Sequence, residues 1–188
     1  MVRITVNKLV ISVIILSFSF SIVILSVAGC ENSDRTKILE QISKETSADQ
    51  VRYDVLSLHL TRGPDFFEIS LLNRGQKEIN VPPLSWKLIG SSTQLMFYDR
   101  GGRQQVLARR ILGDSLTADD PRFWIRVEPG VQIKLRFNIS EIKNFYFFDE
   151  NIHFLQARYS MRYEDSGLVR PKAGGDRLDL ISEPVWVK

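Results

Sequence analysis

The sequence predicts a mainly β domain, an antiparallel sandwich or barrel of about eight or nine short strands. Along residues 51–188, apolar and polar residues alternate with a period of two in short runs. Turn-forming residues separate these runs about every ten positions, and no long amphipathic helix lies between them. Strands that follow one another without crossover helices pair antiparallel, which favours this class over βαβ units.

The first half of the domain shows the alternation clearly. Leu56, Leu58 and Leu60 alternate with polar residues, which predicts a strand with one buried face. Pro82 ends a later short strand because proline has no N–H to donate to the ladder. The strands expected in this half are residues 56–60, 67–71, 79–81, 94–98 and 104–108, and a hairpin turn at residues 99–102 joins the last two.

The second half contains the longest expected strand. Every second position from Leu155 to Tyr163 carries an apolar or aromatic residue, so these side chains share one face and Gln156 lies on the other. Residues 140–145 are expected to form one helical turn, and residues 109–121 to be irregular. The remaining expected strands are residues 123–127, 132–137, 178–181 and 185–187.

The turn chemistry carries a resemblance to a known fold. Turns at Asn73-Arg74-Gly75 and Glu128-Pro129-Gly130, followed by a late tyrosine-rich strand, are similar to the layout of immunoglobulin-like exported domains. This resemblance covers residues 51–188 and implies an immunoglobulin-like sandwich, but it implies no activity.

An apolar run precedes the domain. Residues 1–8 carry Arg3 and Lys8 and no acidic residue, and residues 9–27 are uncharged. This is the order of charge and hydrophobicity found in a signal peptide. At 1.5 Å per residue the run would span about 28 Å as a helix, so a retained transmembrane anchor is the alternative.

The end of the run favours cleavage. Val27, Ala28 and Gly29 stand directly before Cys30, the single cysteine of the chain. This stretch resembles the lipobox of bacterial lipoproteins. The resemblance implies that residues 1–29 are a signal peptide, that Cys30 becomes the acylated first residue, and that its acyl chains hold the protein to a membrane. By the same resemblance, Glu31 after the cysteine favours the outer membrane over the plasma membrane.

A polar tether, residues 30–50, joins the anchor to the domain. Within it Asp34 is a candidate N-cap for a short helix running to about Glu45. The whole chain has a formal charge of +3. Once Arg3 and Lys8 are removed, 23 basic residues face 22 acidic ones, and this near neutrality argues against nucleic acid as a partner. With no thiol beyond Cys30, an apolar core must hold the domain without a disulfide.

No motif indicates catalysis. His59 and His153 are the two histidines, and no Cys, His or acidic cluster has the spacing of a metal site. We therefore expect no catalytic residue, no metal and no cofactor. Asp114, Asp119 and Asp120 could offer oxygen ligands to calcium, but a solvated acidic turn is the favoured interpretation.

Aromatic residues are the candidate partner surface. Four consecutive rings, at residues 145–148, cannot all point inward from one strand, so some must face a loop, an edge or a partner. The candidate surface comprises Phe145, Tyr146, Phe147, Phe148 and Trp124, and a basic group stands at Arg100, Arg103, Arg109 and Arg110.

These observations support three hypotheses. The leading one is a lipid-anchored, noncatalytic envelope protein whose β-sandwich binds another envelope component or supports an assembly. The alternative is a carbohydrate-binding module for cell-wall or surface glycan, with Trp86, Trp124 and Trp186 among its stacking candidates. An envelope enzyme is the third.

Overall fold

The computed structural model describes residues 33–46, 55–87, 91–110, 120–164, 166–168 and 175–187. The signal-like run, residues 27–29 and Cys30 lie outside these ranges, as do Asp114 and Asp119. Among the described residues, no helix has both the length and the apolar character needed to cross a bilayer.

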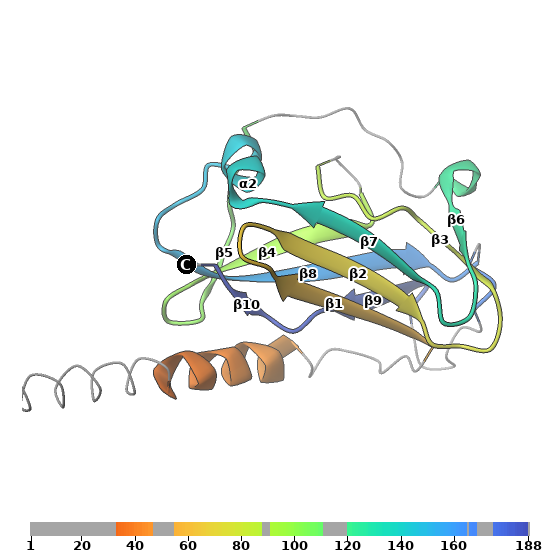
Figure 1. Cartoon of the computed structure of the whole chain (residues 1–188), viewed down its shortest axis with the longest axis horizontal. Coiled ribbons are helices and arrows are strands. Elements are labelled where there is room, and N and C mark those ends of the chain that lie inside the picture. The colour runs from red at the N-terminus through yellow and green to blue at the C-terminus, as the bar shows by residue number, and fades with distance from the viewer. Residues whose placement is uncertain are drawn as a thin grey trace, which may run out of the picture. The chain divides into compact units, whose positions relative to one another are not determined.

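Three strands form the first sheet, in the order β1-β2-β7, and both pairings are antiparallel (Figure 1). In the register of this sheet, Leu58 lies opposite Leu71, which in turn lies opposite Ile133. The strands are β1 (Leu56–Arg62), β2 (Phe67–Asn73) and β7 (Gln132–Phe137).

Five strands form the second sheet around the long strand β8 (Ile152–Arg162). One edge of β8 pairs with β4 (Thr93–Asp99), which continues to β5 (Gln104–Gln105). The other edge pairs with β10 (Val185–Trp186) in its first half and with β9 (Arg177–Ile181) in its second half. A separate two-stranded sheet joins β3 (Ile79–Val81) to β6 (Ile125–Val127).

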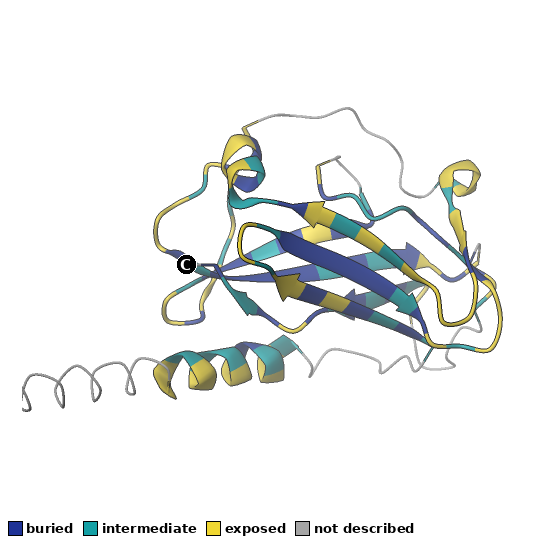
Figure 2. Cartoon of the chain, in the orientation of Figure 1, coloured by how far each residue is buried: buried dark blue, intermediate teal, exposed yellow. Residues whose placement is uncertain are grey.

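The core lies between the two larger sheets. Ile69 and Leu71 of β2 belong to the same buried cluster as Ala157, Tyr159 and Met161 of β8, all with exposed fractions of at most 1% (Figure 2). The predicted mainly β fold with antiparallel sheets packed as a sandwich is therefore confirmed. The immunoglobulin-like strand arrangement remains a prediction.

Two helices accompany the sheets in the described part of the chain. The first covers residues 33–46, close to the predicted span. The second, α2 (Ile139–Phe145), begins at Asn138, whose side chain accepts a hydrogen bond from the Glu141 N–H while the Glu141 side chain accepts one from the Asn138 N–H. This capping box explains why a helix starts directly after β7.

Two predicted strands differ from the structure. The strand expected over residues 104–108 is limited to β5, and a single bridge continues it at Arg109. The strand expected from Phe123 begins instead as a 3-10 turn, η1 (Pro121–Phe123). Asp120 caps this turn by accepting a hydrogen bond from the Arg122 N–H, and Pro121 fits its first position.

Gln156 is the main exception to the predicted alternation of β8. It lies on the face expected to be polar and exposed, but its exposed fraction is only 1%. Its Nε2 donates to the Ser182 carbonyl (2.7 Å) and to Thr46 Oγ1 (3.1 Å), and its Oε1 accepts from Tyr98 Oη (2.6 Å). The burial of Gln156 is tolerated because these partners satisfy its side-chain amide. Tyr98 is buried as well, and its own burial raises the pKa of its hydroxyl to about 12.

Candidate functional site

The aromatic run that follows α2 divides between core and surface. Phe145 and Tyr146 are buried, with ring centroids 5.4 Å and 6.1 Å from Trp86. Phe148 is half-buried with its ring 6.0 Å from that of Phe97. Phe147 points outward and is 58% exposed. The chain leaves the helix in an extended conformation, so neighbouring side chains face opposite sides.

Backbone hydrogen bonds join the aromatic run to residues 108–110. The Phe147 N–H donates to the Ala108 carbonyl (2.9 Å), and the Arg110 N–H donates to the Phe145 carbonyl (2.8 Å). Exposure alternates along residues 104–110, so Val106, at 95% exposed, shares the outward side with Ala108. We call the outward-facing residues of this stretch the arginine–aromatic patch; they are Val106, Ala108, Arg110 and Phe147.

Arg109 and Arg110 both lie on aromatic rings, Arg110 on the outward side and half-buried Arg109 on the inner side. The Arg110 guanidinium is 4.8 Å from the Phe147 ring centre, and its Nε donates to the Tyr146 carbonyl (3.0 Å). The Arg109 guanidinium is 5.6 Å from the Phe145 ring centre and 5.9 Å from that of Tyr146. Burial raises the pKa of Tyr146, and Arg109 acts in the opposite direction. Among the described residues, no carboxylate pairs with either arginine, so the exposed Arg110 can pair with a carboxylate of a partner.

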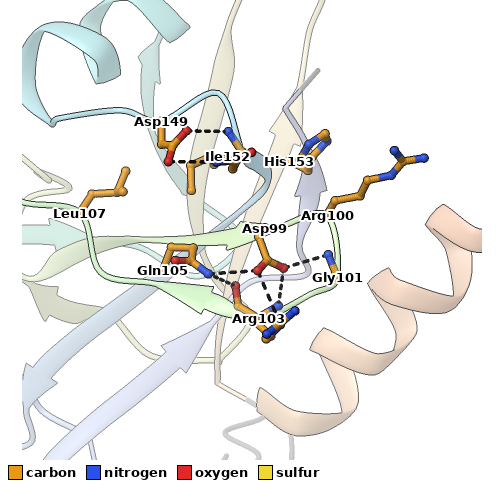
Figure 3. Close-up of a pocket in the computed structure, with 10 residues that line it drawn as sticks. Asp99, Arg100, Gly101, Arg103, Gln105, Leu107, Asp149, Ile152 and His153 are labelled. Atoms are coloured by element: carbon orange, nitrogen blue, oxygen red, sulfur yellow. Dashed lines mark hydrogen bonds and ion pairs between the residues drawn. The ribbon is translucent and has the colours of Figure 1, made fainter.

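Beside the patch, a cavity of about 600 Å³ opens between the β4–β5 hairpin and the start of β8 (Figure 3). We call it the hairpin cavity. Its polar lining comes from the turn residues Arg100 and Arg103 and from Asp149 and His153 on the opposite side. Asp99 holds the hairpin by accepting from the N–H groups of Gly101 (2.8 Å) and Arg103 (3.0 Å).

Trp124 lies apart from the aromatic run. It is half-buried between η1 and β6, at the other end of the sandwich from α2 (Figure 1). Next to it Phe123 is 55% exposed. Asp120, one of the three candidate calcium ligands, forms an ion pair with Arg122. Hydrogen bonds from Arg122 hold the pKa of the Asp120 carboxyl below its usual value.

A sugar-stacking platform needs exposed tryptophan or tyrosine rings, and none of those in the described residues is exposed. Trp86 and the four described tyrosines are buried, whereas Trp124 and Trp186 are half-buried. The Trp186 ring packs against His153 (5.1 Å) and Phe154 (4.9 Å).

The two histidines lie in different surroundings. His59 Nε2 lies 3.1 Å from Ser57 Oγ on the exposed face of β1, and His153 packs against Trp186. In the part of the chain that the structure describes, no group of three or more His, Cys, Asp or Glu residues is placed to hold a metal ion.

Sequence reasoning named the aromatic run and the basic group separately. The structure brings Arg109 and Arg110 to the aromatic run, whereas Arg100 and Arg103 line the hairpin cavity. Sequence reasoning did not identify Val106 or the hairpin cavity. Val106 carried a usable signal, because period-two alternation from Gln105 and Leu107 places it outward. The cavity carried none, because its two walls are more than forty residues apart in the sequence.

Comparison with known proteins adds no assignment: no protein-family model matches the chain, and no curated protein matches it significantly. Any function must therefore be argued from the geometry of the patch and the cavity.

Proposed function

We propose that this protein is a lipid-anchored bacterial envelope protein whose noncatalytic sandwich binds an acidic envelope protein through the arginine–aromatic patch. The observation that carries the proposal is an exposed ring, Phe147, and an exposed aliphatic side chain, Val106, on the same side as Arg110, which has no described carboxylate partner.

The composition of the patch supports a protein partner. Binding energy at protein interfaces is concentrated in a few residues, and aromatic side chains and arginine are enriched among them. Arg110 is held against the Phe147 ring and by the Tyr146 carbonyl, so little side-chain freedom is lost on binding. A guanidinium held in this way complements a carboxylate, which is why we specify an acidic partner.

The anchor is proposed from the lipobox-like stretch of residues 27–29 and Cys30. Acyl chains contribute about 0.8 kcal/mol per buried methylene, so two or three chains on Cys30 would hold the protein firmly at the membrane. The residue after the cysteine, Glu31, supports the outer membrane as its location.

The partner surface is tested by capture from crosslinked envelopes. Phe147→Ala should weaken capture of the acidic partner at least about thirty-fold, the effect of losing about 2 kcal/mol at a central aromatic anchor. Phe123→Ala is the matched control because Phe123 is 55% exposed and also lies beside an arginine. Equal capture by both variants would contradict the proposed surface.

The anchor is tested separately. Cys30→Ser should abolish labelling by a fatty-acid analogue and leave residues 1–29 attached, as measured by intact mass. Unchanged maturation of this variant would contradict lipidation without bearing on the patch.

A further inference from the structure

Strand β7 forms one edge of the first sheet. β2 pairs with one side of β7, and no strand among the described residues pairs with the other side. The edge of a strand carries a row of backbone N–H and C=O groups that can pair with another chain. This edge contains no residue of the arginine–aromatic patch, so binding to it would be independent of the proposed function.

The register shows which backbone groups of β7 face away from β2. The Asn73 N–H donates to the Val131 carbonyl (3.1 Å), so this pair is a hydrogen-bonded position of the ladder. Hydrogen-bonded positions alternate along an antiparallel pair, and Ile133, Leu135 and Phe137 therefore bond to β2. The N–H and C=O groups of residues 132, 134 and 136 point to the unpaired edge.

This edge is accessible, whereas the edge at the other side of the sheet is covered. Gln132, Lys134 and Arg136 are all exposed (Figure 2). On β1 the Arg74 N–H donates to the Val55 carbonyl (2.7 Å), so by the same alternation residues 56, 58 and 60 face the edge. These three leucines have exposed fractions of at most 6%. An incoming strand can therefore reach β7 but not β1.

The inner face of β7 is incompletely covered. Ile133 and Leu135 pack against the core but remain half-buried. Their partners on β2, Leu71 and Ile69, have exposed fractions of at most 1%. A strand added beside β7 would remove the remaining apolar surface from water if its own inward side chains were apolar.

The outer face of β7 carries an excess of positive charge. Lys134 Nζ and Arg136 Nε both bond to the Glu68 carboxylate, at 2.8 Å and 2.5 Å, so two positive charges share one negative charge. Glu68 is the single acidic residue of β1, β2 and β7. Opposite charges on neighbouring strands attract and like charges repel. A second copy of β7 would bring Lys134 and Arg136 against the same two residues, so an acidic strand is favoured over self-pairing.

We propose that β7 binds an extended segment of another protein by antiparallel strand addition, and that this segment alternates apolar and acidic residues. Backbone hydrogen bonds to residues 132, 134 and 136 provide affinity, and the alternating side chains provide selectivity. The apolar residues of the segment lie beside Ile133 and Leu135, and its carboxylates lie beside Lys134 and Arg136. The antiparallel direction is specified because such pairing is slightly more stable per residue than parallel pairing.

Fluorescence anisotropy with the full chain in detergent tests the choice of segment. The probe is a labelled seven-residue peptide that alternates glutamate and valine and is blocked at both ends. It should bind, whereas a lysine–valine peptide of the same length and a peptide with the sequence of residues 132–137 should not. Absence of binding by the glutamate–valine peptide would overturn the proposal. Equal or tighter binding of the lysine–valine peptide would do the same, and equal or tighter binding of the β7 peptide would indicate self-association instead.

Methylation of the peptide backbone tests the mode of binding. Directly opposite residues of an antiparallel pair point to the same face, so the glutamate N–H groups should donate to β7. A peptide with N-methylated glutamates should therefore lose binding, and one with N-methylated valines should keep it. Equal binding by the two methylated peptides would refute strand addition.

Variants locate the binding on β7. Lys134→Gln should weaken binding of the glutamate–valine peptide about three-fold, the effect of one exposed ion pair. Lys44→Gln removes the same charge from an exposed lysine of the first helix and is the matched control. Phe147→Ala, in the arginine–aromatic patch, should leave peptide binding unchanged. A loss with Phe147→Ala and none with Lys134→Gln, each folded by circular dichroism, would move the peptide to the patch and overturn the proposal.

Discussion

The two ends of the sandwich carry the same pair of residue types in different electrostatic settings. At one end the Arg110 guanidinium lies 4.8 Å from the Phe147 ring centre, and at the other the Arg122 guanidinium lies 5.9 Å from that of Phe123. Arg122 is paired with Asp120 at 2.5 Å, whereas Arg110 donates to a backbone carbonyl. A second arginine at that other end, Arg126 on β6, is likewise paired with a carboxylate, that of Glu78, at 3.0 Å.

This difference indicates at which end of the sandwich a partner protein would gain more binding free energy. An arginine already paired with a carboxylate must give up that contact before it can serve a second one, so its net contribution to binding is small. An exposed phenylalanine beside a paired arginine is therefore an ordinary surface residue. The same phenylalanine beside an unpaired arginine is a candidate anchor.

The largest expected effect is a loss of stability when the core beneath the patch is altered. Trp86 is 1% exposed and contacts Phe137, Phe145 and Tyr146, so Trp86→Ala should lower the free energy of unfolding by about 3–5 kcal/mol. Trp124→Ala at the other end should cost clearly less, because Trp124 is only half-buried. Chemical denaturation measures both, and equal losses would show that the patch end is no better packed than its counterpart.

The next effect concerns charge. Arg110→Ala should weaken partner capture about ten-fold, and Arg110→Lys should restore little because lysine lacks the planar group that lies on Phe147. Arg122→Ala is the control at the paired end. Affinity measured with the captured partner at rising salt should fall for the native protein. Full rescue by lysine would argue that charge alone matters at this position.

A smaller effect concerns the helix that leads into the aromatic run. Asn138→Ala removes the side chain that caps α2 and should lower the free energy of unfolding by about 1 kcal/mol. Asn138→Asp keeps an acceptor and should cost less. If alanine and aspartate behave alike in thermal unfolding, the capping box contributes nothing measurable.

The smallest effect is a pH dependence at the same helix. Hydrogen bonds from the Lys87 ammonium and then from the Asn138 N–H hold the pKa of Glu141 below its ordinary value of 4.5. A carboxyl with a lowered folded-state pKa contributes stability above the unfolded-state value and loses it as the pH falls through the folded-state value. Glu141→Gln should therefore reduce the acid sensitivity of unfolding below about pH 4.5. An identical pH profile for the variant would contradict this role.

Local patterns account for most of the predicted fold. The period-two alternation of β1 and β8 predicts their buried faces because a strand places alternate side chains on opposite sides. The Asp99 hairpin follows from aspartate and glycine at a turn, where Gly102 adopts a positive φ of 79°.

Contacts between distant residues could not be predicted in the same way. Gln156 is buried by partners 26 and 110 positions away, and no window around it contains that information. The pairing of Arg109 with Tyr146 decides that Phe147 lies beside Ala108 and Arg110, and it depends on how the segment after a hairpin meets the end of a helix far along the chain. The sequence therefore predicts which kinds of residue contribute to the candidate site, but it does not predict how they are arranged in space.

The two edges of β8 have a consequence for synthesis. β9 and β10 cover one edge of this strand, and β10 contacts it at Phe154 and Leu155. Until residues 185–186 have been translated, that stretch of the longest strand presents unpaired N–H and C=O groups, which attract other strands. The second sheet therefore cannot close before β10 has been synthesised, and a chaperone that keeps the nascent chain extended would guard this one edge.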